Sequence, residues 1–179
     1  MIDGKSILTV ILARSGSKRL PNKNILDLAG KPLIAWSIDS GLKSKYIDKV
    51  IVSSDSDEIL DISKKYGADI IKRPSILAND TASSFDAVKH TIENIKDVLD
   101  YVVLLQPTSP LRNNKHIDEA FELLNKNRAD AIISVTEVDH SPLWSSTLPK
   151  DGSMSNFITK DILGKRSQDL EKYYRLNGA

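Results

Sequence analysis

The 179-residue chain has the composition of a globular protein, with 40% hydrophobic and 27% charged residues. Its formal net charge of +1 gives no general attraction for nucleic acid, and its length fits a single domain. The absence of cysteine excludes disulfides, a thiol nucleophile and a cysteine-ligated zinc site. No apolar run approaches about 18 residues, and the N-terminus has no signal-peptide pattern. We therefore expect a cytoplasmic protein with no nucleic-acid or membrane partner.

The first predicted strand, residues 6–13, leads into the most informative segment of the chain, a turn rich in basic and small polar residues. Its candidate binding residues are Arg14, Ser15, Gly16, Ser17, Lys18, Arg19, Lys23 and Asn24. A Gly/Ser turn exposes backbone N–H groups and the cations add charge, so the pattern suits a polyphosphate. It lacks the Gly-Lys-Ser/Thr ending of a P-loop, and a solvated basic loop is the alternative interpretation.

Strand-like apolar runs alternate with helical patterns along the next hundred residues. The predicted strands are 48–54, 69–72, 101–106 and 130–136, and the predicted helices are 32–44, 55–66, 82–97 and 114–127. Pro32 suits a first helical position and Gly67 suits a helix end. The alternation predicts right-handed βαβ units and an α/β, Rossmann-like fold, with a mostly parallel sheet flanked by helices.

Three polar segments follow the predicted strands: the basic turn, residues 53–55 and residues 106–110. In open α/β sheets, ligands bind beyond the carboxyl ends of the strands. The order of elements therefore predicts that these segments share one site.

Two possible metal patterns have simpler explanations. Asp55, Ser56 and Asp57 directly precede a helical pattern, so N-capping is the favoured interpretation. The histidines are dispersed with no pair at i, i+4 spacing, and we interpret all three as solvated or satisfied residues. These residues are His90, His116 and His140.

The regular pattern fails after Val138. We therefore expect an α/β core over residues 1–138 and a less regular segment over residues 139–179, within the same domain. A loosely ordered tail is the alternative interpretation of this second segment.

Several strings in this order resemble the acylneuraminate cytidylyltransferases over nearly the whole chain. They are the basic turn, Leu28-Ala-Gly-Lys-Pro-Leu33, Val52-Ser-Ser-Asp55, Arg73-Pro74, Asp80-Thr-Ala-Ser-Ser84, Leu104-Leu-Gln-Pro-Thr-Ser-Pro-Leu-Arg112 and Tyr174-Arg-Leu-Asn-Gly-Ala179. The resemblance implies the fold of the nucleotide-diphospho-sugar transferases. It also implies a homodimer formed through a C-terminal dimerisation arm, which would bury aromatic residues such as Trp144 and Tyr174.

The reaction implied by the resemblance is transfer of CMP from CTP to the anomeric hydroxyl of N-acetylneuraminate, which releases pyrophosphate. One alternative is the same reaction on legionaminic, pseudaminic or Kdo-type acids. Another is an inactive, truncated module that binds CTP. The resemblance also implies Mg²⁺, whose ligands we expect beyond Ala179 and not in this chain, where the final strand is expected to be truncated.

The resemblance assigns the nucleotide to the first two thirds of the chain. Arg14 and Lys23 would act on the triphosphate in catalysis, with Lys18 and the backbone amides of residues 15–17 assisting. Asn24 would contact the ribose or a phosphate. The cytosine base would meet Arg73, Ala82 and Ser84. Helix capping by Thr81 and Ser83 is the alternative interpretation of this last segment.

The sugar set implied by the resemblance consists of Gln106, which also contacts the ribose, Thr108, Ser109, Arg166, Arg175 and Asn177. Arg112 is expected to have only a structural role. The Arg166 assignment departs from the family pattern, because Ser167 separates it from Gln-Asp-Leu.

Overall fold

The computed structural model describes residues 4–178. The chain divides into two compact units, unit 1 up to Ile132 and unit 2 from Ile133 to Gly178. The arm expected over residues 139–179 falls within unit 2, apart from Ala179, which lies outside the described residues.

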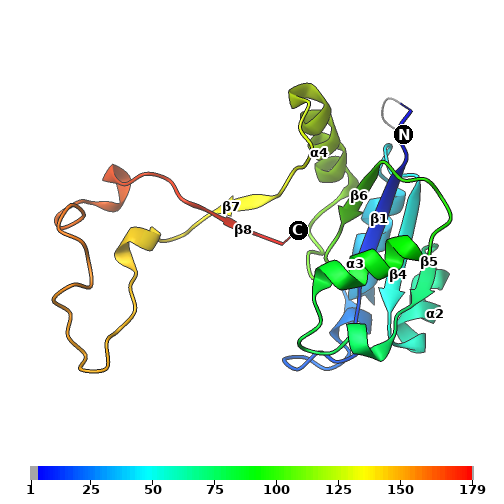
Figure 1. Ribbon diagram of the computed structural model, residues 1–179, viewed down its shortest axis with the longest axis horizontal. Coiled ribbons are helices and arrows are strands. Elements are labelled where there is room, and N and C mark those ends of the chain that lie inside the picture. Colours follow the sequence, from blue (N-terminus) through cyan, green and yellow to red (C-terminus); the bar gives the residue numbers. More distant parts are fainter. Residues whose placement is uncertain (1–3, 179) are drawn as a thin grey trace. The chain divides into compact units, whose positions relative to one another are not determined.

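Unit 1 is built on a four-stranded parallel sheet (Figure 1). Its strands are β1 (Ile7–Leu12), β4 (Lys49–Ser54), β5 (Asp69–Lys72) and β6 (Tyr101–Leu104), in the order β5-β4-β1-β6. In the centre of the sheet, Val10 pairs with Ile51 on one side and with Leu104 on the other. The predicted parallel α/β architecture is confirmed, and β1 and β4 have the continuous apolar character of strands buried on both faces.

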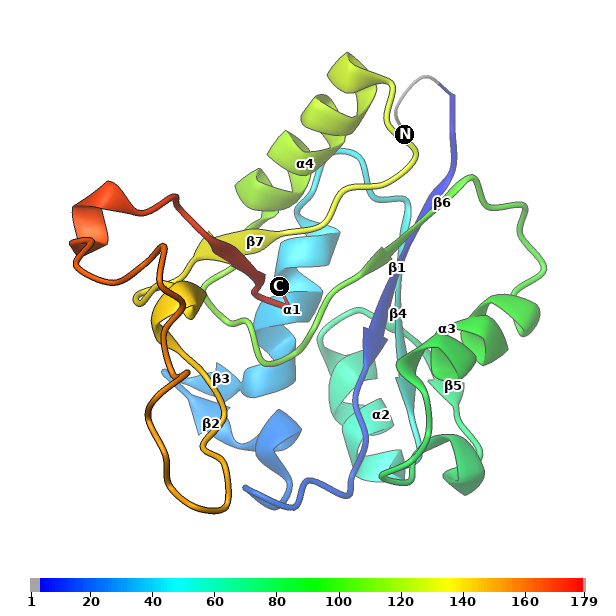
Figure 2. The same ribbon diagram turned by 60° about the vertical axis from the view of Figure 1, so that its left-hand side comes forward.

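Helices cover both faces of this sheet (Figure 2). They are α1 (Leu33–Leu42), α2 (Asp57–Lys65), α3 (Ser84–Glu93) and α4 (Asn114–Asn127). Alternate residues of β1 serve the two faces: Ile7 and Ile11 pack in the cluster that includes α1, α2 and α4, and Leu8 and Val10 pack against α3. No helix among residues 4–178 is both long and apolar enough to cross a membrane.

Short elements join the strands and helices of unit 1. They are the 3-10 helices η1 (Lys23–Ile25) and η2 (Ser75–Leu77) and the hairpin of β2 (Asp27–Leu28) and β3 (Lys31–Pro32). Pro32 lies at the N-cap of α1 rather than at its first helical position, because the extended hairpin runs directly into the helix. Gly67 follows α2 with φ +91° and donates its N–H to the Lys64 carbonyl, which confirms the predicted helix end.

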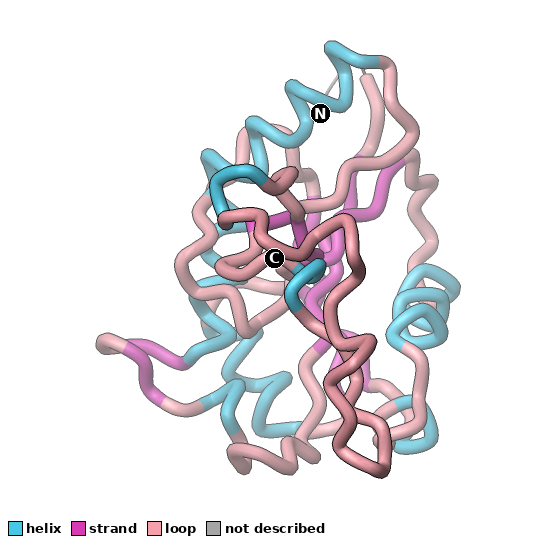
Figure 3. The backbone as a smooth tube through the Cα atoms, turned by 90° about the vertical axis from the view of Figure 1, so that its left-hand side faces the viewer, coloured by secondary structure: helices cyan, strands magenta, loops and turns pink. Residues whose placement is uncertain are grey.

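The fifth predicted strand, 130–136, does not join the parallel sheet. Only β7 (Val135–Glu137) forms there, and it pairs antiparallel with β8 (Tyr174–Leu176) inside unit 2. The prediction was wrong because hydrophobic pattern indicates a strand without indicating its partner. Apart from this pair and the 3-10 helices η3 (Pro142–Trp144) and η4 (Ser167–Asp169), loop makes up the described part of unit 2 (Figure 3).

Candidate functional site

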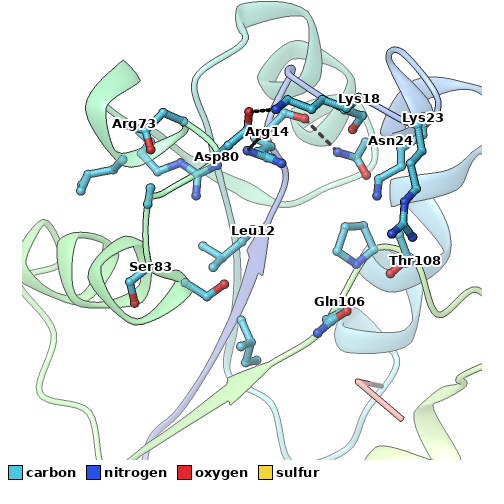
Figure 4. Close-up of a pocket in the computed structure, with 18 of the residues that line it drawn as sticks. Leu12, Arg14, Lys18, Lys23, Asn24, Arg73, Asp80, Ser83, Gln106 and Thr108 are labelled. Carbon is cyan, nitrogen blue, oxygen red and sulfur yellow. Dashed lines mark hydrogen bonds and ion pairs between the residues drawn. The ribbon is translucent and has the colours of Figure 1, made fainter. Parts of the chain in front are cut away.

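A cleft of about 600 Å³ opens where the carboxyl ends of β1 and β6 meet the residues after β5 (Figure 4). This volume is within the range of about 300–1,000 Å³ typical of ligand pockets. The cleft gathers residues predicted from separate strings: Arg14, Ser17, Lys18, Arg19, Lys23, Asn24, Arg73, Ala82, Ser84, Gln106 and Thr108. All of them belong to unit 1. Of the three segments predicted to share a site, the basic turn and residues 106–108 line this cleft, whereas residues 53–55 do not.

Three of the predicted residues in unit 1 are not part of the cleft lining: Ser15, Gly16 and Ser109. The lining also includes Ser83, for which the sequence offered only a capping role, and residues to which it assigned none: Leu12, Leu20, Leu77, Asn79, Asp80, Leu104, Leu105 and Pro107. Strand-end leucines and a proline give the cleft an apolar wall. Asp80 had a sequence signal, since it opens the Asp-Thr-Ala-Ser-Ser string.

Asn24, which is only 3% exposed, stabilises the basic turn that follows β1. Its Nδ2 donates a hydrogen bond of 3.1 Å to the Arg14 carbonyl (Figure 4). This bond ties η1 to the basic turn, and the half-buried Lys23 of η1 lines the same cleft as Arg14 and Lys18. Arg14, Lys18 and Lys23 therefore all lie at this cleft.

Asp55 closes the other side of the basic turn. Its two carboxylate oxygens accept hydrogen bonds from the Ser15 N–H at 3.0 Å and from the Ser15 hydroxyl at 2.6 Å. Burial opposes ionisation of Asp55, but the hydrogen bonds from Ser15, together with its own backbone N–H and the charge of Arg73, lower the pKa of this carboxyl overall. The N-capping predicted for this segment is confirmed at Ser56 and not at Asp55, and Asp57 lies in the first turn of α2. The cap of α2 is Ser56, whose hydroxyl accepts from the Ile59 N–H.

The backbone amides of the basic turn, which we expected to assist in phosphate binding, already have partners at Ser15 and Ser17. The Ser15 N–H is used by Asp55, and the Ser17 N–H donates to the Ser15 carbonyl at 2.8 Å. In this conformation, both amides have acceptors within the protein. Any phosphate contact in the turn then depends chiefly on the cationic side chains.

Asp80 forms ion pairs with two of those cations. Its oxygens lie 3.0 Å from Arg14 Nη1 and 2.6 Å from Lys18 Nζ (Figure 4). The hydrogen bond from Lys18, followed by that from Arg14, lowers the pKa of Asp80, so this carboxyl is ionised at neutral pH. The carboxylate occupies the position relative to the cations that a phosphate oxygen would take.

Arg73 is 5% exposed and lines the cleft directly after β5. Its N–H donates to the Ser54 carbonyl at 2.8 Å. Burial lowers the pKa of its guanidinium, the charge of Asp55 opposes this, and the charge of Arg14 adds to it. Arg73 Nε is buried without a hydrogen-bond partner among the described residues. A buried donor of this kind is available to a ligand acceptor.

The segment before α3 combines a helix cap with the predicted base contacts. The Ser83 hydroxyl accepts from the Phe85 N–H at 3.0 Å, which confirms capping by Ser83. Capping by Thr81 was wrong, because its N–H and its hydroxyl both donate to Asn79 Oδ1 in a local turn. Ala82 and Ser84 thus flank Ser83, the N-cap of α3. The helix itself begins at Ser84, two residues after the predicted start at residue 82.

Gln106 enters the cleft from the loop after β6 (Figure 4). Its carbonyl accepts from the Ser37 hydroxyl at 3.0 Å and from the guanidinium of Arg112 at 3.4 Å. Burial lowers the pKa of Arg112 to about 10. Arg112 also donates to the Ser37 hydroxyl at 2.7 Å, so it fixes the backbone of the loop, as its expected structural role requires.

The remaining predicted sugar residues lie in unit 2. Arg166 pairs with Asp169 at 2.9 Å, and Arg175 lies in β8 opposite Thr136. Asn177 accepts from the Ser134 hydroxyl at 2.6 Å, which ties β8 to the residue before β7. These contacts describe unit 2 itself, and sugar binding by these residues stays a prediction.

No group of three or more His, Asp or Glu side chains able to hold a metal occurs in the described part of the chain. The two carboxylates beside the basic turn are already engaged, Asp55 by Ser15 and Asp80 by the cations. His116 is satisfied in a capping box with Asn113. His90 does not fit the interpretation as a solvated or satisfied residue, because its Nδ1 is buried without a hydrogen-bond partner among residues 4–178.

A parallel α/β sheet with a cationic cleft at its carboxyl edge defines the class of nucleotide-binding α/β domains. Comparison with known proteins narrows this class: the cytidylyltransferase family model matches residues 8–175. The chain belongs to the cytidylyltransferase family.

Curated relatives extend over nearly all of this chain. It is 46% identical over 174 residues to the N-acylneuraminate cytidylyltransferase of Escherichia coli O18:K1:H7, covering 97% of this chain and 41% of the relative. It is 39% identical to the enzyme of that name from Streptococcus agalactiae serotype V, covering 96% and 42%. It is 37% identical to the pseudaminic acid cytidylyltransferase of Campylobacter jejuni serotype O:23/36, covering 96% and 75%. The chain thus spans about two fifths of the length of the N-acylneuraminate relatives.

Solved structures share the fold. A CMP:2-keto-3-deoxy-manno-octonic acid synthetase solved with CTP aligns with a TM-score of 0.67 at 20% identity, over 97% of this chain and 72% of that one. The 4-diphosphocytidyl-2C-methyl-D-erythritol synthase of Anaerococcus prevotii aligns with a TM-score of 0.64 at 19% identity, over 97% and 69%.

Proposed function

We propose that this chain transfers CMP from CTP to the anomeric hydroxyl of N-acetylneuraminate and releases pyrophosphate. The observation that carries the proposal is the convergence of Arg14, Lys18 and Lys23 in one cleft with Ala82 and Ser84. The identity of 46% to the N-acylneuraminate cytidylyltransferase of Escherichia coli supports the choice of sugar.

The proposed chemistry needs positioning and charge, without a covalent nucleophile. The anomeric oxygen attacks the α-phosphorus of CTP in line with the departing pyrophosphate. Arg14 and Lys23 neutralise the developing negative charge, and Lys18 binds the outer phosphates. Gln106 and Asn24 orient the ribose.

The base contacts would discriminate cytosine by its 4-amino group. The Ala82 carbonyl and the Ser84 hydroxyl are acceptors that match this donor, and Arg73 is a donor for the base carbonyl O2. Uracil presents an acceptor at the same position, which leaves acceptor facing acceptor.

A second sugar class has specific support. Besides the pseudaminic acid enzyme, the chain is 38% identical to the CMP-N,N'-diacetyllegionaminic acid synthase of Legionella pneumophila. These sugars share a 2-keto acid and an anomeric hydroxyl with N-acetylneuraminate. Thr108, Ser109, Arg166, Arg175 and Asn177 are the residues we propose for sugar recognition, and they would decide between the acids.

The proposal includes a metal and a second subunit. Mg²⁺ would stabilise the leaving pyrophosphate, but no ligand for it can be nominated within residues 4–178, so no step is assigned to it. Unit 2 would serve as the dimerisation arm of a homodimer. The exposed apolar side chains of this unit support that role.

The test is pyrophosphate release from CTP with each candidate sugar, in the presence of Mg²⁺. We expect N-acetylneuraminate to give the highest kcat/KM. A higher value with pseudaminic or legionaminic acid would move the assignment to that sugar. CTP binding without turnover on any of these sugars would show a binding module.

A further inference from the structure

The peptide segment that aims Arg14 into the cleft is held at three successive residues. The Ala13 N–H donates to the Ser53 carbonyl at 3.1 Å, and the Arg14 carbonyl accepts from Asn24 at 3.1 Å. Both donors of Ser15 then end on the carboxylate of Asp55. Of these three sets of hydrogen bonds, the one from Ser15 to Asp55 has a charged acceptor. Charge-assisted hydrogen bonds are stronger than bonds between neutral groups.

Asp55 is in place to do this because of the sheet order. β1 and β4 are neighbours with Leu12 beside Ser53, so the residues that follow the two strands emerge side by side. Asp55 comes directly after β4 and before the Ser56 cap, and it points across to the turn after β1 rather than into its own helix.

The charge of Asp55 also acts on the buried guanidinium of Arg73. Arg73 and Arg14 repel each other, and Asp55 is the carboxylate that offsets this repulsion at Arg73. One side chain therefore serves both the turn and the buried cation.

We propose that Asp55 is a positioning residue of the triphosphate site, which fixes the direction of Arg14 by holding Ser15. The inference rests on the proposed binding of CTP. Asp55 itself does not line the cleft.

This role predicts an effect opposite to simple electrostatics. A negative charge beside a triphosphate site repels the ligand, so neutralising it would strengthen CTP binding. Neutralising a positioning carboxylate instead frees the Ser15 turn and weakens binding. The sign of the change therefore separates the two explanations.

The experiment measures the dissociation constants of CTP and CMP for the wild-type chain and for Asp55→Asn by calorimetry. We expect Asp55→Asn to bind CTP about tenfold more weakly. Its affinity for CMP, which lacks the β- and γ-phosphates, changes less. A loss of structure would weaken both ligands alike. The matched control is Asp57→Asn, which removes an exposed carboxylate paired with Lys72 in the first turn of α2 and leaves CTP affinity unchanged.

CTP affinity of Asp55→Asn equal to or stronger than that of the wild type would overturn the inference while leaving the proposed function standing. An equal loss for CTP and CMP would overturn it too. If Asp55→Asn does not fold, Ser15→Ala tests the inference instead. This substitution removes the hydrogen bond from the Ser15 hydroxyl to Asp55 and keeps the charge of Asp55. We expect a loss of a few-fold for CTP, and unchanged affinity overturns the inference. A wild-type chain that does not bind CTP would overturn the proposed function, and the inference with it.

Discussion

Lys23 begins η1, and its half-buried side chain lines the cleft beside Arg14. We predict that Lys23→Ala weakens CTP binding by about tenfold, because it removes a charge-assisted contact to phosphate. The melting temperature should hardly change, since a cationic side chain at the cleft surface contributes little stability. Calorimetry and thermal unfolding measure the two quantities. Lys89→Ala, on the exposed side of α3, is the matched control, and an equal loss in both variants would contradict the assignment.

Asp80 should have the opposite effect on the same ligand. A bound phosphate must replace its carboxylate at Arg14 and Lys18, so these ion pairs oppose binding. We predict that Asp80→Asn binds CTP a few-fold more tightly at low salt, and that the gain shrinks as salt screens the charges. Titrations at two ionic strengths measure this.

The control for Asp80 is Asp86→Asn, which removes a carboxylate from the first turn of α3. Asp86 forms no ion pair with Arg14 or Lys18 among the described residues. An equal gain in both variants would mean that Asp80 acts only through general charge, not by occupying the phosphate position.

At the scale of elements, the loop from η2 to the start of α3 should select the base. We predict that CTP binds about ten- to a hundredfold more tightly than UTP, because uracil would leave acceptors unpaired at Ala82 and Ser84. Ser84→Ala should reduce this ratio. Direct titration with both nucleotides measures it, and equal affinities in the wild-type chain would refute the assignment of the base site to this loop.

The elements differ in how far their sequence determined them. β1 and β4 were predictable because buried parallel strands read as apolar runs bounded by polar turns. β5 was predictable from the two isoleucines of its short run, although most of its side chains are exposed. The 130–136 run was not, because its partner, β8, lies some forty residues further along the chain. Within the site, the cations were predictable from their clustering. The bonds from Ser15 to Asp55 were not, since they depend on which strands become neighbours.

At the scale of the whole molecule, unit 2 buries little of its own apolar surface. Among the described residues of this unit, Ile162 is the one large aliphatic or aromatic side chain that is buried, at 5% exposed, whereas Leu163 and Leu176 are 66% and 70% exposed. A two-stranded ribbon such as β7–β8 is marginally stable without a hydrophobic partner. Exposed apolar side chains in such a segment support the dimerisation role proposed for unit 2.

We therefore predict that the protein sediments as a dimer at micromolar concentration. Leu163→Asp should shift it toward the monomer, because burying an unpaired carboxylate at an apolar interface is unfavourable. Val98→Asp is the matched control: this side chain is 87% exposed but lies in unit 1, before β6, so its substitution should leave the dimer intact.

Sedimentation velocity over a concentration series measures the oligomeric state of all three proteins. A wild-type chain that remains monomeric would overturn the predicted dimer. A Leu163→Asp variant that dimerises as well as the wild type would remove residue 163 from the interface. CTP titration of the Leu163→Asp monomer then asks whether the cleft depends on dimerisation. We expect it to bind CTP with unchanged affinity, because every residue that lines the cleft belongs to unit 1.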